Sequence, residues 1–175
     1  MSDVAFLKGE LVTLWPYVRG RYARDILYKL WYMIESEGGT GRLFWGQQVQ
    51  DEALRGDLPA FVETAQQRLV LIVQDNKDQD LAGLFWFEDW ILKQRATISV
   101  YMRKQSRGPA AREAMKIALR YAYEIMDVSH VWGLTPFVEA CRYAERCGFK
   151  HLCDLPGLAI IKGTPHDVHV LRAGR

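Results

Sequence analysis

The most informative stretch of the chain is Val100-Tyr101-Met102-Arg103-Lys104-Gln105-Ser106-Arg107-Gly108-Pro109-Ala110, where a strand runs into a turn and the turn opens a helix. The first amides of a helix have no intrahelical acceptor, and the helix dipole adds partial positive charge there. Gly108 lets a ligand approach the backbone closely, and Pro109 suits the first helical position. The stretch therefore predicts an anion site at a helix start.

Basic residues surround this predicted site. Only one acid, Glu113, is close in sequence to the five cations, which are Arg103, Lys104, Arg107, Arg112 and Lys116. Such a cluster suits a ligand that carries several phosphates. The alternative is a capped helix with a solvated basic flank, and the residues alone leave both interpretations open.

The rest of the chain alternates between strand and helix patterns. Pro16 ends the first predicted strand, a polar turn at 75–80 separates two strands, and Gly148 ends the last predicted helix. The predicted strands are 10–17, 68–74, 81–90, 95–102 and 130–134 with a β section at 149–171, and the predicted helices are 20–36, 58–68, 109–126 and 139–147. The order β-α-α-β-β-β-α-β-α-β-β indicates an α+β fold with a mixed, largely antiparallel sheet.

Composition places the chain among ordinary globular proteins. Its 175 residues are 49% hydrophobic and 25% charged, which favours one domain over 1–175. A net charge of +2 does not indicate a nucleic-acid partner. Three cysteines without a CxxC pair are typical of a reducing compartment. With neither a signal peptide nor a stretch of ~20 apolar residues in view, we expect a cytoplasmic protein without membrane contact.

The residues resemble the GNAT superfamily of acetyl-CoA-dependent N-acetyltransferases. Gln105-x-x-Gly108-x-Ala110 is similar to the Gln/Arg-x-x-Gly-x-Gly/Ala signature that holds the CoA pyrophosphate after the fourth strand. Residues 140–149, ending in Gly148-Phe149, resemble the helix before the family's sixth strand. Most of the chain follows the family's element order. The branch that acetylates ribosomal-protein and other N-terminal amines is the most similar.

The resemblance implies which residues hold acetyl-CoA and what is missing. The implied cofactor residues are Val100, Met102, Gln105, Ser106, Arg107, Gly108, Pro109 and Ala110. Three family features are absent: Phe137 stands where an Asn is frequent, Ala144 stands where many members have a proton-donating Tyr, and the strand at 96–102 carries no acid. These differences leave the acid and the base of the reaction open.

Acetyl transfer to an amine needs a route for the amine proton. Glu88 and Asp89, near the end of the strand at 81–90, are the candidate bases, and Tyr101 with Ser99 could relay a proton. All four residues also have a purely structural interpretation. Glu88 and Asp89 could be the solvated end of a strand, and the positions of Ser99 and Tyr101 follow from the ordinary alternation of a strand.

Two further segments carry residues that could bind a ligand. In the family, the segment that corresponds to 35–48 selects the acceptor. Its Phe44 and Trp45, together with Trp31, could line a pocket for the acceptor. Its acids Glu35 and Glu37 could attract a cationic amine. For a metal, His166-x-x-His169 would place its rings on opposite faces of a strand. We therefore expect no metal site.

Together these features predict a GNAT-like enzyme that transfers an acetyl group directly from acetyl-CoA to a primary amine, either a peptide N-terminus or a small amine. The alternative is a GNAT-fold protein that binds CoA, has lost efficient catalysis, and acts as a sensor or interaction module. The sequence leaves a homodimer open.

Overall fold

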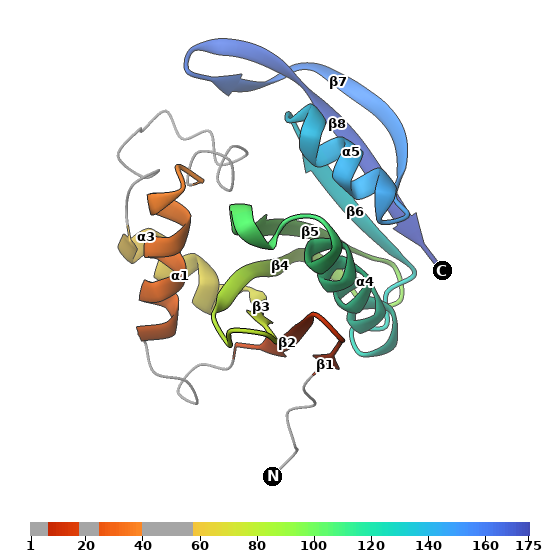
Figure 1. The fold of residues 1–175 in the computed structure, drawn as a ribbon. Coiled ribbons are helices and arrows are strands. Elements are labelled where there is room, and N and C mark those ends of the chain that lie inside the picture. Colours follow the sequence, from red (N-terminus) through yellow and green to blue (C-terminus); the bar gives the residue numbers. More distant parts are fainter. Residues whose placement is uncertain (1–6, 18–24, 40–57) are drawn as a thin grey trace.

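The computed structural model describes residues 7–17, 25–39 and 58–175. A single eight-stranded sheet runs in the order β1-β2-β3-β4-β5-β6-β8-β7, with helices on both of its faces (Figure 1). The strands are β1 Leu7–Lys8, β2 Val12–Pro16, β3 Leu69–Asp75, β4 Leu81–Ile91, β5 Arg95–Met102, β6 His130–Thr135, β7 Lys150–Ile161 and β8 Thr164–Gly174. The helices are α1 Asp25–Ser36, α3 Leu58–Gln67, α4 Pro109–Glu124 and α5 Val138–Arg146, with a 3₁₀ turn, η2, at Lys104–Ser106.

The structure confirms the predicted α+β class and the predicted order of elements. The first strand is shorter than expected, because the Gly9 amide donates to the Val12 carbonyl (2.8 Å) and closes a turn between β1 and β2. Helix α4 ends at Glu124, two residues earlier than predicted, and Asp127 in the turn that follows has a positive φ of 51°. The start of the predicted helix 20–36 lies outside the described residues, as do Phe44 and Trp45. None of the described helices is long and apolar enough to cross a membrane.

Strand alternation divides the core into two clusters, one on each face of the sheet. Phe85 and Phe87 of β4 pack with α4 in one cluster, whereas Leu84 and Trp86 pack with α1 and α3 in the other. Successive side chains on a strand point to opposite faces, so β4 contributes to both clusters. Its continuous buried run from Ala82 to Phe87 is the pattern of a strand that is covered on both sides.

The parallel pair β5 and β6 is the feature that shapes the site. Every other pairing in the sheet is antiparallel, and α4 forms the crossover between these two strands. In the described residues their ladder covers only Arg95–Thr97 of β5 and His130–Trp132 of β6, although β5 continues to Met102 and β6 to Thr135. The sheet is therefore open between the carboxyl ends of the two strands, where α4 and α5 begin.

Candidate active site

A cavity of about 510 Å³ occupies the opening between β5 and β6. It is bounded by residues from β5, from the first two turns of α4, from the end of β6 and from α5. They include Ile98, Ser99, Val100, Tyr101, Met102, Arg107, Gly108, Ala111, Arg112, Gly133, Thr135, Phe137, Glu139, Ala140, Arg142, Tyr143, Ala144 and Arg146. Because the ladder has stopped, backbone groups of β5 on this edge are available to a ligand rather than to β6.

The start of α4 forms one end of the cavity. Gly108 is the N-cap residue, with φ 94° and ψ −127°, and no side chain caps the helix. A Cβ atom at Gly108 would meet no protein atom within 4 Å, so the space beside this backbone is open to a ligand. The free amides of the first turn therefore lie beside the cavity, as an anion site requires.

Four arginines line the cavity, and they give it a positive character. Arg107 and Arg112 come from the start of α4, and Arg142 and Arg146 come from α5; Glu139 is the one acid among the lining residues. The Nε of Arg107 donates to the Met102 carbonyl (3.2 Å), which fixes this side chain at the end of β5. Guanidinium groups are well suited to phosphate oxygens, because they present several donors in one plane.

The other predicted cations lie elsewhere. Arg103 donates to the Leu81 carbonyl (3.0 Å) and lies 3.6 Å from Asp80, and neither it nor Lys104 lines the cavity. Glu113 does not balance the cluster either, because its carboxylate accepts from the amides of Glu10, Leu11 and Val12 at 2.9, 2.7 and 3.0 Å.

The residues of the predicted cofactor turn divide into two groups. Val100, Met102, Arg107 and Gly108 line the cavity. Gln105, Ser106, Pro109 and Ala110 belong to the same turn but are not among the lining residues; Gln105 is exposed and Ser106 is buried in η2.

Glu88 reaches the cavity through Ser99. The Ser99 hydroxyl, on a residue that lines the cavity, donates to Oε1 of Glu88 (3.3 Å). Oε2 of Glu88 forms an ion pair with Arg68 (2.7 Å), and the Arg68 guanidinium lies 5.2 Å from the ring centre of Trp86. Asp89, the other predicted base, is exposed at a register shift of β4 with a positive φ of 50° and does not line the cavity.

Tyr101 lies on the same face of β5 as Ser99 and is held by Glu37, the residue that follows α1. Its hydroxyl donates to Oε2 of Glu37 (2.7 Å), and the same carboxylate accepts from the Lys104 amide (3.0 Å). Gly39 packs so closely on the Tyr101 ring that a Cβ atom there would lie 2.2 Å from it. The predicted acceptor-binding acid Glu37 is therefore engaged by protein groups.

Tyr143 has a structural bond although it lines the cavity. Its hydroxyl donates to the Ala111 carbonyl (2.7 Å), which ties α5 to α4. Burial and the neighbouring Cys147 raise the pKa of Tyr143 far above its usual range, so the phenol stays protonated. Ala144 and Phe137, which replace the expected Tyr and Asn, also line the cavity.

Sequence reasoning missed the arginines of α5 and Arg68. Glu139, Arg142, Tyr143 and Arg146 are three or four residues apart, so the helical period places them on one face; that signal was present in the sequence. No local pattern links Arg68 to Glu88, since these residues meet only through the pairing of β3 and β4.

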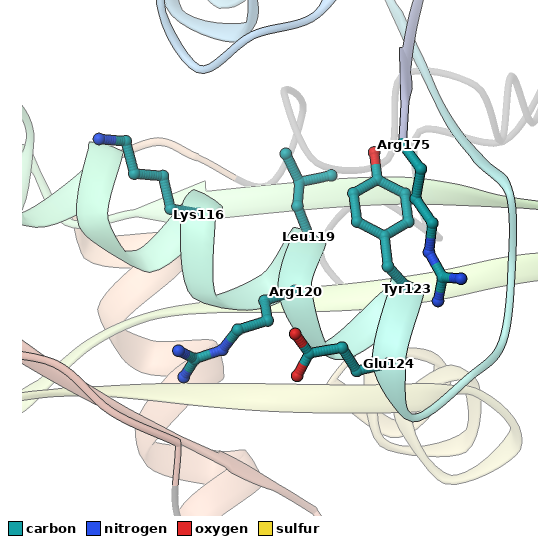
Figure 2. Close-up of a pocket in the computed structure, with 6 residues that line it drawn as sticks. All are labelled: Lys116, Leu119, Arg120, Tyr123, Glu124 and Arg175. Carbon is teal, nitrogen blue, oxygen red and sulfur yellow. The ribbon is translucent and has the colours of Figure 1, made fainter.

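A second hollow, of about 580 Å³, lies on α4 beside the C-terminus (Figure 2). Its lining residues are Lys116, Leu119, Arg120, Tyr123, Glu124 and Arg175. Figure 2 shows the side chains of α4 extending in different directions, while Arg175, from the C-terminal segment, lies beside Tyr123. The arrangement does not form a convergent binding site.

Comparison with known proteins identifies the fold. No family model and no curated protein matches the chain. Among solved structures, the ribosomal-protein-S5-alanine acetyltransferase from Vibrio fischeri has a TM-score of 0.75 at 9% identity, covering 97% of this chain and 96% of that one. A GCN5-related N-acetyltransferase from Brucella melitensis has a TM-score of 0.74 at 19% identity, with 99% and 80% covered.

A third similar structure is spermidine N-acetyltransferase from Vibrio cholerae in complex with CoA and spermine. It has a TM-score of 0.71 at 17% identity and covers 95% of this chain and 96% of that chain. All three similarities extend over almost the whole chain. The protein therefore has the fold of the GNAT acetyltransferases.

Proposed function

We propose that the protein transfers an acetyl group from acetyl-CoA to a primary amine. The observation that carries this proposal is the opening between β5 and β6, because it joins a free strand edge, an uncapped helix start and four arginines in one cavity. The similar Vibrio cholerae enzyme, which acetylates spermidine, was solved with CoA and spermine. Its fold supports a CoA thioester as the donor here.

We place the parts of acetyl-CoA along the cavity in the order in which they are joined. We assign the pyrophosphate to the turn from Gln105 to Ala110, where the first-turn amides of α4 and Arg107 can donate to its oxygens. The pantetheine arm would lie along Val100 and Met102, whose backbone groups can pair with its amides. This placement brings the thioester toward Ser99 and Tyr101.

The reaction needs no covalent enzyme intermediate. The amine nitrogen attacks the thioester carbonyl, a C–N bond forms, the C–S bond breaks, and the amine loses one proton. We assign that proton to Glu88, through the Ser99 hydroxyl that bonds it. The thiolate takes up a proton in turn; Tyr101 can supply one if its hydroxyl turns from Glu37 toward the sulfur.

We propose a primary amine as the acceptor, without choosing between a peptide N-terminus and a small amine. The structures with similar folds include an enzyme named for the alanine of a ribosomal protein and one named for spermidine. Glu37 and Glu88 do not favour either class, because Glu37 is bonded to Tyr101 and Glu88 is paired with Arg68. Both a peptide N-terminus and a small polyamine therefore belong in the first assay.

The alternative function is a CoA-binding protein without efficient turnover. Ala144 lines the cavity where a proton-donating Tyr is expected, and the hydroxyl of Tyr143 is committed to Ala111. Both functions predict CoA binding, so turnover separates them.

The experiment is release of free thiol from acetyl-CoA in the presence of spermidine or an alanine-initiated peptide. Glu88→Gln keeps the shape of the side chain but cannot take the proton, so we expect kcat to fall by about 10²–10⁴-fold. Glu63→Gln, an exposed change on α3, serves as the matched control, and Asp89→Asn tests the neighbouring carboxylate. If the wild-type protein binds acetyl-CoA but releases no thiol with any amine, the non-catalytic alternative holds.

A further inference from the structure

Two histidines and an aspartate meet on the hairpin of β7 and β8. Nε2 of His151 lies 2.7 Å from Oδ1 of Asp154, and Nδ1 of His169 lies 2.6 Å from the same oxygen. The ligand atoms of all three residues lie within 4.8 Å of one another. In the part of the chain that the structure describes, this is the one group of His, Cys, Asp and Glu side chains with such an arrangement.

The fold brings these residues together through a bulge. Residues three apart on a regular strand point to opposite faces, yet His151 and Asp154 share a face. The register shifts between His151 and Cys153, where Leu171 and Val170 are the consecutive partners on β8, so Leu152 is the extra residue. Asp154 then pairs directly with His169, and His151 pairs two positions further along β8.

Because the sequence does not reveal this bulge, the candidate pair of ligands in the sequence is His166 and His169. His166 and His169 are three apart on β8, and the register shift opposite them places its extra residues on β7, between Leu155 and Ala159. His166 pairs with Ala159, away from the cluster. His169 instead meets two residues of the neighbouring strand. The expected absence of a metal site therefore rested on a pair of histidines that the fold separates.

We propose that His151, Asp154 and His169 bind one divalent transition-metal ion of the zinc class. Two imidazole nitrogens and a carboxylate oxygen are a common set of protein ligands for Zn²⁺, and a fourth position would be open to water. The side chains of His151, Asp154 and His169 are 34%, 46% and 20% exposed, so an ion can enter from solvent. The ion would replace the protons that now bridge the three groups.

The geometry requires a small adjustment. Ligand atoms about 2.1 Å from a tetrahedral metal are about 3.4 Å from one another. The two bridged pairs, now 2.7 and 2.6 Å apart, must therefore open by about 0.7 and about 0.8 Å, which rotation of exposed side chains can supply. The cluster lies near helix α5, since Asp154 contributes, after burial and Glu145, to raising the pKa of the Cys141 thiol on that helix.

The bound ion would fix the start of β7 to β8 beneath α5. Residues Arg142, Tyr143 and Arg146 of that helix line the proposed cofactor cavity, whereas the three ligands do not. The site is thus separate from the active-site cavity, and the proposal does not depend on acetyl transfer.

The test is calorimetric titration of the untagged, chelator-treated protein with Zn²⁺, together with absorption spectroscopy after addition of Co²⁺. We expect one equivalent of Zn²⁺ to bind and to raise the melting temperature. His151→Ala, His169→Ala and Asp154→Asn should each weaken binding by more than about tenfold, since losing even a supporting partner of a ligand has that effect. His166→Ala, on the same hairpin but outside the cluster, is the matched control and should bind as the wild type does.

Three results would overturn the proposal. They are absence of Zn²⁺ binding at millimolar concentration, equal affinity in the cluster variants and the wild type, and a thiolate–Co²⁺ charge-transfer band. The last would assign the ion to a site built from Cys141, Cys147 or Cys153. The melting temperatures of the metal-free variants show separately whether each variant still folds.

Discussion

Replacing Gly108 by alanine separates the strain at this position from its role in binding. The residue has φ 94° and ψ −127°, a region that an L residue enters at a cost of about 1–3 kcal/mol. Because the new Cβ would meet no protein atom within 4 Å, this strain is the whole expected loss of folding free energy. The melting temperature should fall by about 2–4 °C per kcal/mol in a chain of this length.

The same methyl group projects into the open space where we place the pyrophosphate. We therefore expect Gly108→Ala to weaken acetyl-CoA binding at least tenfold, which is about 1.4 kcal/mol. Gly163, in the turn between β7 and β8, also has a positive φ of 78° and open space around it. Gly163→Ala should consequently lose stability to a similar degree and keep its affinity.

Thermal unfolding and calorimetric titration with acetyl-CoA measure the two effects on the same samples. Gly108→Glu extends the series, since a negative charge at this helix start would compete with the phosphates for the amides and arginines. Wild-type affinity in both Gly108 variants would refute the placement of the pyrophosphate. Equal loss of affinity in Gly108→Ala and Gly163→Ala would show that strain, rather than contact with the ligand, is responsible.

Three further predictions follow from single contacts. Glu113→Ala removes the acceptor of three backbone amides and should lower the free energy of unfolding by roughly 1–3 kcal/mol in urea denaturation, whereas the exposed Glu124→Ala on the same helix should change it little. Burial raises the pKa of Tyr143, so the unfolded chain loses the phenol proton first as the pH passes about 10, and the free energy of unfolding should fall there. Tyr143→Phe should show a smaller fall in the free energy of unfolding between about pH 9 and about pH 11. An unchanged pH dependence in this variant would contradict the argument. Arg142→Ala should weaken acetyl-CoA binding roughly tenfold by the loss of a charged hydrogen bond, and Arg120→Ala, outside the cavity, should not.

Local patterns in the sequence were sufficient for the fold. Alternation in β3, β4 and β5, the helical period of α4 and the glycine after α5 each act within one element, and the structure confirms those elements with boundaries shifted by one or two residues. The uncapped start of α4 at Gly108 was also visible, because Gly followed by Pro marks the beginning of a helix. These features depend on neighbours in the chain and not on the tertiary arrangement.

Contacts between distant strands could not be predicted in this way. Arg68 meets Glu88 only because β3 pairs with β4 in one register, and Glu113 meets residues 10–12 because α4 packs on the β1–β2 turn. The bulge at Leu152 has no Gly or Pro to mark it, and it alone places His151 and Asp154 on one face. Such details are set by pairing energies summed over whole strands.

The opening between β5 and β6 is the basis of the account, and its most direct test is calorimetric titration of the wild-type protein with acetyl-CoA beside the analogue that lacks the 3′-phosphate. We predict one binding site per chain with micromolar affinity, and weaker binding of the analogue because it presents fewer charges to the arginines of the cavity. No binding at millimolar acetyl-CoA would contradict the account and would leave the similarity to acetyltransferases as one of architecture alone.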